Sequence, residues 1–148
     1  MFGVKGTGVA GHRFETADGG MGIELRCHGT VYKGYPYKMN LYNSTTVPFG
    51  TLAPATQTYP EKIVVALEAG ASGEVKCFQL YGICDAYVAN GVTAGVYLEA
   101  CNTDTDFTSQ SSTKDVNTSA MALEANATGS SALKKIVLND IPTPCAAS

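Results

Sequence analysis

Few residues in this chain have the types and spacing that catalysis requires. Glu68 and Glu124 occupy the same place in two matching sequence phrases. Neighbouring phrases would bring together two carboxylates, the pair that general acid and base catalysis uses. His28 follows Cys27, but adjacent side chains on a strand point to opposite faces, so these two cannot act as base and nucleophile. We therefore predict that the protein is not an enzyme and has no small-molecule substrate. A small hydrolase that uses the two glutamates is kept as an alternative.

Cofactor and metal motifs are incomplete. The run Gly6–Gly11 matches the glycine fingerprint of dinucleotide-binding folds, but it lacks the buried strand before it and the helix after it that hold the pyrophosphate. Asn102, Asp104 and Asp106 have the spacing of a calcium loop, yet Phe107 stands where the sharp turn needs glycine. The sequence therefore predicts no cofactor and no metal.

The cysteines and the composition exclude several other classes. The five cysteines are odd in number, irregularly spaced and mostly within apolar runs, which indicates buried free thiols. No stretch approaches the roughly 20 apolar residues of a membrane span, and the start of the chain does not resemble a secretory signal. No basic patch with interleaved aromatic residues is present, so we expect no membrane and no nucleic-acid partner. The cysteines are Cys27, Cys77, Cys84, Cys101 and Cys145.

A repeated phrase indicates how the chain is built. Residues 66–73 read Ala-Leu-Glu-Ala-Gly-Ala-Ser-Gly and residues 122–129 read Ala-Leu-Glu-Ala-Asn-Ala-Thr-Gly. Each copy ends an apolar run, crosses a turn and leads into a second apolar run, which predicts two related β-hairpins in one domain with one core. Gly82 interrupts the longest apolar run, residues 75–88, and is expected to bend one long strand at a barrel corner. A helix over residues 119–127 is the alternative, because that stretch has high helix propensity.

The organisation that follows is mainly β. We predict a flexible glycine-rich N-terminal arm at residues 1–22, a β-rich core domain at residues 23–141 with a polar surface loop at 102–119, and a C-terminal tail at 142–148. Residues 1–40 carry five basic and three acidic side chains, a balance of +2, although the whole chain has a net charge of −3. This N-terminal part of the chain is therefore suited to an acidic partner surface. Tyr32, Tyr35, Tyr37 and Tyr42 form a tyrosine-rich stretch, which is a candidate interface.

The order of several phrases over residues 61–140 resembles the capsid cement, or decoration, proteins of tailed bacteriophages. These phrases are Val64–Glu68, Tyr81–Val88, Thr93–Leu98 and Ala120–Ala125, the last leading to Ile136–Leu138. The resemblance implies a single compact β-barrel or "β-tulip" domain that often trimerises on the outer surface of the shell, with an arm that reaches across capsid subunits. The five cysteines and the insert at residues 32–60 depart from this family and leave the oligomeric state open.

The sequence thus predicts a structural virion protein, made in the host cytoplasm, that binds the capsid exterior and bridges neighbouring subunits of the major capsid protein as a homotrimer. A small protein that bridges subunits stabilises a shell by contact alone. The arm residues expected to anchor it are Phe2, Val4, Val9, Arg13 and Phe14. The alternative is a receptor- or glycan-binding β-rich module of a virion or surface, acting through the tyrosines and the 102–119 loop.

Overall fold

The computed structural model describes residues 5–40, 49–52, 62–100, 106–110 and 118–139. Within these ranges the chain forms ten β-strands and a three-residue 3-10 helix, and no helix there is long and apolar enough to cross a membrane. The predicted mainly β class with a closed barrel is confirmed. The elements in chain order are β1 (Arg13–Glu15), η1 (Ala17–Gly19), β2 (Met21–Cys27), β3 (Pro36–Asn40), β4 (Phe49–Leu52), β5 (Lys62–Ala66), β6 (Val75–Val88), β7 (Tyr97–Ala100), β8 (Phe107–Ser109), β9 (Ala120–Ala122) and β10 (Ala132–Leu138).

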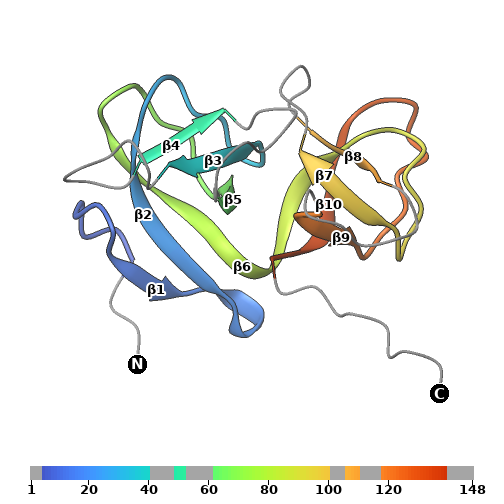
Figure 1. The fold of residues 1–148 in the computed structure, drawn as a ribbon, viewed down its shortest axis with the longest axis horizontal. Coiled ribbons are helices and arrows are strands. Elements are labelled where there is room, and N and C mark those ends of the chain that lie inside the picture. Colours follow the sequence, from blue (N-terminus) through green and yellow to red (C-terminus); the bar gives the residue numbers. More distant parts are fainter. Residues whose placement is uncertain (1–4, 41–48, 53–61, 101–105, 111–117, 140–148) are drawn as a thin grey trace.

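The strands close into two five-stranded rings that share β6 (Figure 1). The first barrel has the strand order β2-β4-β3-β5-β6 and closes through the β2–β6 pairing. The second barrel has the order β6-β10-β9-β7-β8 and closes through a β6–β8 pairing. In each ring one pairing is parallel, β2–β4 in the first and β6–β8 in the second, and the other four are antiparallel. The two barrels therefore have the same topology, and β1 is added to β2 outside the first ring.

The sequence repeat is the visible part of this duplication. Both copies of the phrase connect a β-hairpin, β5 to β6 in the first barrel and β9 to β10 in the second, so the prediction of two related hairpins is confirmed. The helix alternative is wrong, since Ala120–Ala122 form strand β9. Corresponding hydrogen bonds recur in both barrels. The bond from Leu67 N to Cys77 O matches that from Leu123 N to Lys135 O. The bond from Gly34 N to Ala66 O matches that from Gly95 N to Ala122 O, and the bond from Gly70 N to Val31 O matches that from Asn126 N to Val92 O.

Strand β6 belongs to both barrels because it bends at Gly82. Gly82 has a φ of 101°, and a Cβ atom there would lie 2.7 Å from the Cα of Gly20. Only glycine adopts this backbone conformation readily and leaves room for the Gly20 main chain. The predicted bend in one long strand is confirmed, and it passes β6 from the left-hand barrel to the right-hand barrel in Figure 1.

The interior consists of two apolar clusters where the sequence predicted one core. Strand β5 lies between them: Val64 and Ala66 belong to the cluster of the first barrel, and Ile63 and Val65 belong to the cluster of the second. Alternate residues of a strand point to opposite faces, so one strand can supply both clusters. A five-stranded ring encloses few side chains, which is why ten short strands build two small cores.

Three short strands lie where the sequence predicted an arm or loops. Strand β1 falls in the predicted arm, β4 in the proline-containing stretch, and β8 in the predicted 102–119 surface loop. The surface-loop prediction is wrong at Phe107, which is fully buried in the second core. Strands β1 and β8 each contain a single apolar residue, which gives no periodic signal, so these two strands could not be found from the pattern. The predicted tail at 142–148 lies outside the described residues.

Candidate functional site

The N-terminal segment, residues 5–15, is packed on strand β2. Gly11 N donates to Glu24 O at 2.7 Å, and Glu24 N donates to His12 O at 2.8 Å, which extends the pairing of β1 with β2 toward the N-terminus. The Glu24 side chain is buried and accepts hydrogen bonds from the Thr7 hydroxyl, from Thr7 N and, at 2.9 Å, from Gly8 N. One carboxylate on β2 therefore holds the outer part of the segment.

The environment of Glu24 favours its charged form. Burial by itself raises the pKa of this carboxyl, but the hydrogen bonds from Thr7 and Gly8, with His12 nearby, lower the pKa below its usual value of 4.5. An ionised carboxylate can accept hydrogen bonds from several N–H and O–H groups, whereas the protonated acid has fewer acceptor sites. These hydrogen bonds therefore stabilise the ionised form. The segment is therefore bound most firmly while Glu24 is ionised.

This packing differs from the flexible arm that the sequence predicts for residues 1–22. Phe14 is 1% exposed and lies against Gly22, where an added Cβ would be only 2.3 Å from the Phe14 ring. The prediction that Phe14 anchors the protein to a partner is corrected, because its ring is buried against Gly22 of β2, on the outside of the first barrel. Val9 is 61% exposed and Arg13 is also exposed, so these two predicted anchors face outward. Phe2 and Val4 lie outside the described residues.

The tyrosine stretch divides between surface and core. Tyr37 is buried, accepts a hydrogen bond from Tyr32 N at 2.8 Å and packs edge-on against Phe78, so its predicted interface role is corrected. Tyr32 is 53% exposed, and Tyr35 lies between the rings of Tyr32 and Tyr87, with both centroid distances 5.2 Å. Tyr42 lies outside the described residues.

We call Tyr32, Tyr35 and Tyr87 the tyrosine cluster. Tyr87 comes from β6, and its backbone N donates to Gly34 O at 2.9 Å, which brings the β2–β3 connection of the first barrel beside the second barrel. Leu133 of β10 borders the cluster and is 44% exposed. Sequence reasoning missed Tyr87 and Leu133 because they lie far from the tyrosine stretch along the chain.

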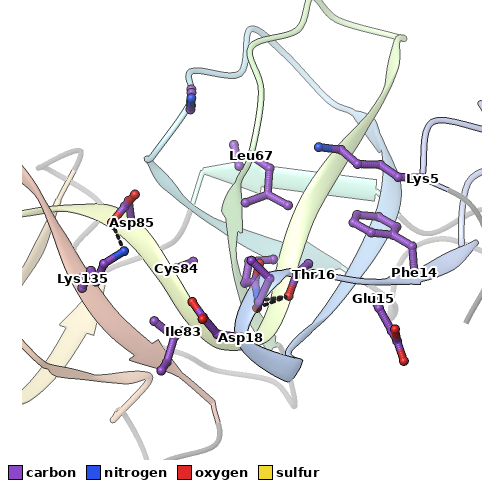
Figure 2. A pocket seen from close by; sticks show the side chains of 14 residues that line it. Lys5, Phe14, Glu15, Thr16, Asp18, Leu67, Ile83, Cys84, Asp85 and Lys135 are labelled. Atoms are coloured by element: carbon purple, nitrogen blue, oxygen red, sulfur yellow. Dashed lines mark hydrogen bonds and ion pairs between the residues drawn. The ribbon is translucent and has the colours of Figure 1, made fainter.

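A pocket of about 390 Å³ lies between the two barrels (Figure 2). Its apolar lining includes Phe14, Leu67 and Ile83. Charges of both signs surround it, with Asp18 from the η1 turn, Asp85 from β6 and Lys135 from β10. Asp85 and Lys135 form an exposed ion pair at 3.4 Å. Nothing in the sequence pattern predicts this pocket, because its walls come from six separate stretches of the chain.

The residues considered for catalysis have structural partners. Glu68 accepts a hydrogen bond from Cys77 N, and Glu124 accepts one from Lys135 N, so each carboxylate closes its own hairpin. Among the described residues no group of three or more histidine, cysteine or acidic side chains could hold a metal ion. Asp106 accepts a hydrogen bond from the Ser131 hydroxyl at 2.8 Å, and the rest of the calcium-like run, residues 102–105, lies outside the described ranges.

Three cysteines are free and buried, as the sequence predicts: Cys27, Cys77 and Cys84. Burial raises the pKa of all three thiols, that of Cys84 to about 12 with a further contribution from Asp85. A thiol with a raised pKa holds little thiolate at neutral pH and is a poor nucleophile. Cys101 and Cys145 lie outside the described residues.

The fold is similar to that of a solved phage structure. It matches the head fiber gp8.5 N base in bacteriophage phi29 with a TM-score of 0.56, at 15% sequence identity, over 80% of this chain and 92% of that chain. No protein-family model and no curated protein matches the sequence. At this level of identity the likeness concerns the fold, and it extends over nearly the whole of the phi29 chain.

Proposed function

We propose that the protein is a structural protein of a phage virion that binds the outer surface of the capsid. The observation that carries this proposal is the fold shared with the base of the phi29 head fiber over 92% of that chain. The sequence resemblance to capsid cement proteins supports the same class of virion protein. Glu68 and Glu124 each accept a backbone hydrogen bond within their own hairpin, which is consistent with a structural role for these two carboxylates.

The mechanism that we propose is bridging by contact. A protein that binds two neighbouring subunits of the major capsid protein adds buried area that must be lost before those subunits separate. Two rigid barrels held by one continuous strand, β6, present two contact surfaces at a fixed spacing. Contacts through both surfaces raise the effective affinity without any further bond.

Two groups of outward-facing residues are suited to this contact. Val9 and Arg13 are exposed on the segment that covers β2 of the first barrel, and an apolar side chain and a guanidinium are both suited to a partly acidic protein surface. The tyrosine cluster lies at the junction of the two barrels and offers aromatic area together with hydroxyl groups. We assign the capsid contact to these residues and place the protein on the capsid exterior as a homotrimer.

Co-sedimentation with phage heads tests the proposal. Heads of the phage that encodes this chain, prepared without the protein, should bind it, whereas the free major capsid protein should not. Val9→Asp combined with Arg13→Glu should weaken binding at least about tenfold, since central contacts of this kind are each worth over about 1 kcal/mol. Lys62→Glu changes an exposed charge on β5 and is the control. Light scattering that gives three times the chain mass supports the trimer, and full-length protein that never binds heads refutes the proposal.

The tyrosine cluster supports a second candidate function, a glycan- or receptor-binding module. Tyr32 exposes half of its surface, and its ring lies against that of the partly buried Tyr35, so an aromatic side chain is presented to solvent. Binding of the purified protein to host cells or to glycans, lost in Tyr32→Ala with head binding unchanged, would establish this second function.

A further inference from the structure

Strand β2 of the first barrel corresponds to the second half of strand β6, which belongs to the second barrel. Glu24 pairs with Cys77, and Asp85 pairs with Lys135. Cys77 O and Lys135 O accept equivalent hydrogen bonds from the two copies of the repeated phrase, so Glu24 corresponds to Asp85. Two residues earlier on each strand, Gly22 corresponds to Ile83.

In the first barrel the outer edge of this strand is covered. Glu24 N donates to His12 O, and Glu24 O accepts from Gly11 N. Gly22 pairs with Phe14 of β1 in the same antiparallel ladder. The N-terminal segment thus satisfies the main-chain groups of Gly22 and Glu24 that point away from β6.

In the second barrel no segment of the described residues covers the same edge, which we call the open edge. Residues of an antiparallel strand alternate between those that bond the neighbouring strand and those that face away from it. Tyr87 N donates to Gly34 O instead of to β10, and Lys135 O accepts from Leu123 N instead of from β6. The main-chain groups of the odd-numbered residues in this part of β6 therefore point away from β10. Ile83 and Asp85 therefore direct their N–H and C=O groups outward. In the described part of the chain no hydrogen bond reaches these main-chain groups.

The pocket between the barrels lies along this open edge. Ile83, Cys84 and Asp85 line one side of it, and Phe14 and Asp18 line another (Figure 2). The segment that covers the edge of β2 precedes that strand in the chain and folds back on it. The chain before Ile83 is the first half of β6, which runs into the first barrel and is paired there with β2 and β5. The part of the chain directly before Ile83 is therefore not available to cover the open edge.

We propose that the open edge of β6 binds an extended segment of a partner protein as an added antiparallel strand. The corresponding edge of the first barrel already binds an extended segment in this way, and strand addition to an exposed edge is a recurring mode of peptide recognition. The inference rests on the proposed function for the identity of the partner, which is then a segment of the shell protein. Main-chain hydrogen bonds to Ile83 and Asp85 supply the affinity, and the pocket receives the side chains.

We do not expect residues 11–15 of a second copy of this chain to supply the added strand. Residues 11–15 are bound on β2 of their own molecule, and their release would expose Gly22 and Glu24. Phe14 also needs glycine opposite it, since its ring lies where a Cβ of Gly22 would be, and Ile83 carries a side chain at the corresponding position. The partner strand is accordingly expected to have a small residue opposite Ile83.

Two variants at one position test the inference. Asp85→Pro removes the outward N–H and leaves the bonds to β10, which Cys84 and Ala86 make, and proline is tolerated at such strand edges. Asp85→Ala keeps the N–H and also loses the ion pair with Lys135, so it is the matched control. Co-sedimentation with phage heads should show that Asp85→Pro binds about tenfold more weakly than Asp85→Ala, because one main-chain hydrogen bond is lost.

Amide hydrogen exchange on the unmodified protein gives an independent test. In the free protein the amides of Ile83 and Asp85 should exchange fast, whereas those of Gly22 and Glu24 should be protected, and binding to heads should protect Ile83 and Asp85. Head binding that leaves these amides fast, or equal binding by both variants, overturns the inference and leaves the proposed function standing. If the unmodified protein does not bind heads, the proposed function itself is refuted. Protection that rises with protein concentration in the absence of heads assigns the edge to a second copy and overturns the proposed partner.

Discussion

Gly82→Ala adds a single methyl group at the bend in β6, and we expect it to destabilise the connection between the two barrels more than a methyl group added elsewhere. Gly82 has a φ of 101°, and the Cβ of an alanine there would lie 2.7 Å from the Gly20 Cα, which is backbone and cannot rotate away. Gly82→Ala therefore combines an unfavourable backbone conformation with a steric overlap. Both effects act where β6 passes from one barrel to the other.

The expected loss of stability is the sum of these two costs. A residue with a Cβ at positive φ costs about 1–2 kcal/mol. Overpacking against rigid neighbours costs a further 1–3 kcal/mol or so. For a chain of about 150 residues each kcal/mol lowers Tm by roughly 2–4 °C, so Gly82→Ala should lower Tm by about 5–15 °C.

Calorimetry of two variants separates the costs. Gly91 has a φ of 89° and no atom within 4 Å of its added Cβ, so Gly91→Ala carries the backbone cost alone. Its Tm should fall by about half as much as that of Gly82→Ala, or less. Equal losses in the two variants would refute the reasoning that close approach to Gly20 requires a glycine at the bend.

Other perturbations have outcomes that follow from single contacts. Tyr37→Phe removes the acceptor for Tyr32 N and should cost about 1 kcal/mol in urea unfolding. Asn126→Ala removes a buried amide that donates to two carbonyls and should cost about 2–3 kcal/mol in the same assay. The lowered pKa of Glu24 adds stability that is fully present above its usual value of 4.5 and is lost as pH falls through the folded-state pKa. Glu24→Gln should therefore show a smaller loss of stability than the unmodified protein between about pH 5 and pH 3, measured by denaturant titration. The Cys84 thiol, whose pKa is raised to about 12, should react with a thiol reagent far more slowly in the native protein than after denaturation.

Local patterns in the sequence were enough for the hairpins and the bend. The repeated phrase identified both hairpins because each copy places a carboxylate at the end of one apolar run and a turn before a second apolar run. Gly82 was recognisable because a glycine inside a long apolar run has few structural uses other than a bend or a close approach. The strand character of residues 120–122 followed from the β-branched residues of the first copy, Ile63–Val65.

Contacts between distant residues were beyond such patterns. Residues 5–15 read as a flexible arm because glycine-rich composition predicts high backbone entropy, but Glu24 binds this segment through main-chain and hydroxyl donors that composition does not reveal. Tyr32 and Tyr37 have the same residue type and neighbouring positions, yet one faces solvent and the other fills a core.

The sequence by itself determined a mainly β chain with two related hairpins and a bent central strand, because alternation, turn residues and glycine act over a few neighbouring positions. Only the tertiary structure decided that the hairpins close into two barrels, which side chains reach the surface, and that one strand edge beside a pocket has no pairing partner among the described residues. Those features depend on which strands meet across long stretches of chain, and the identity of a strand's neighbours is a property of the whole packing.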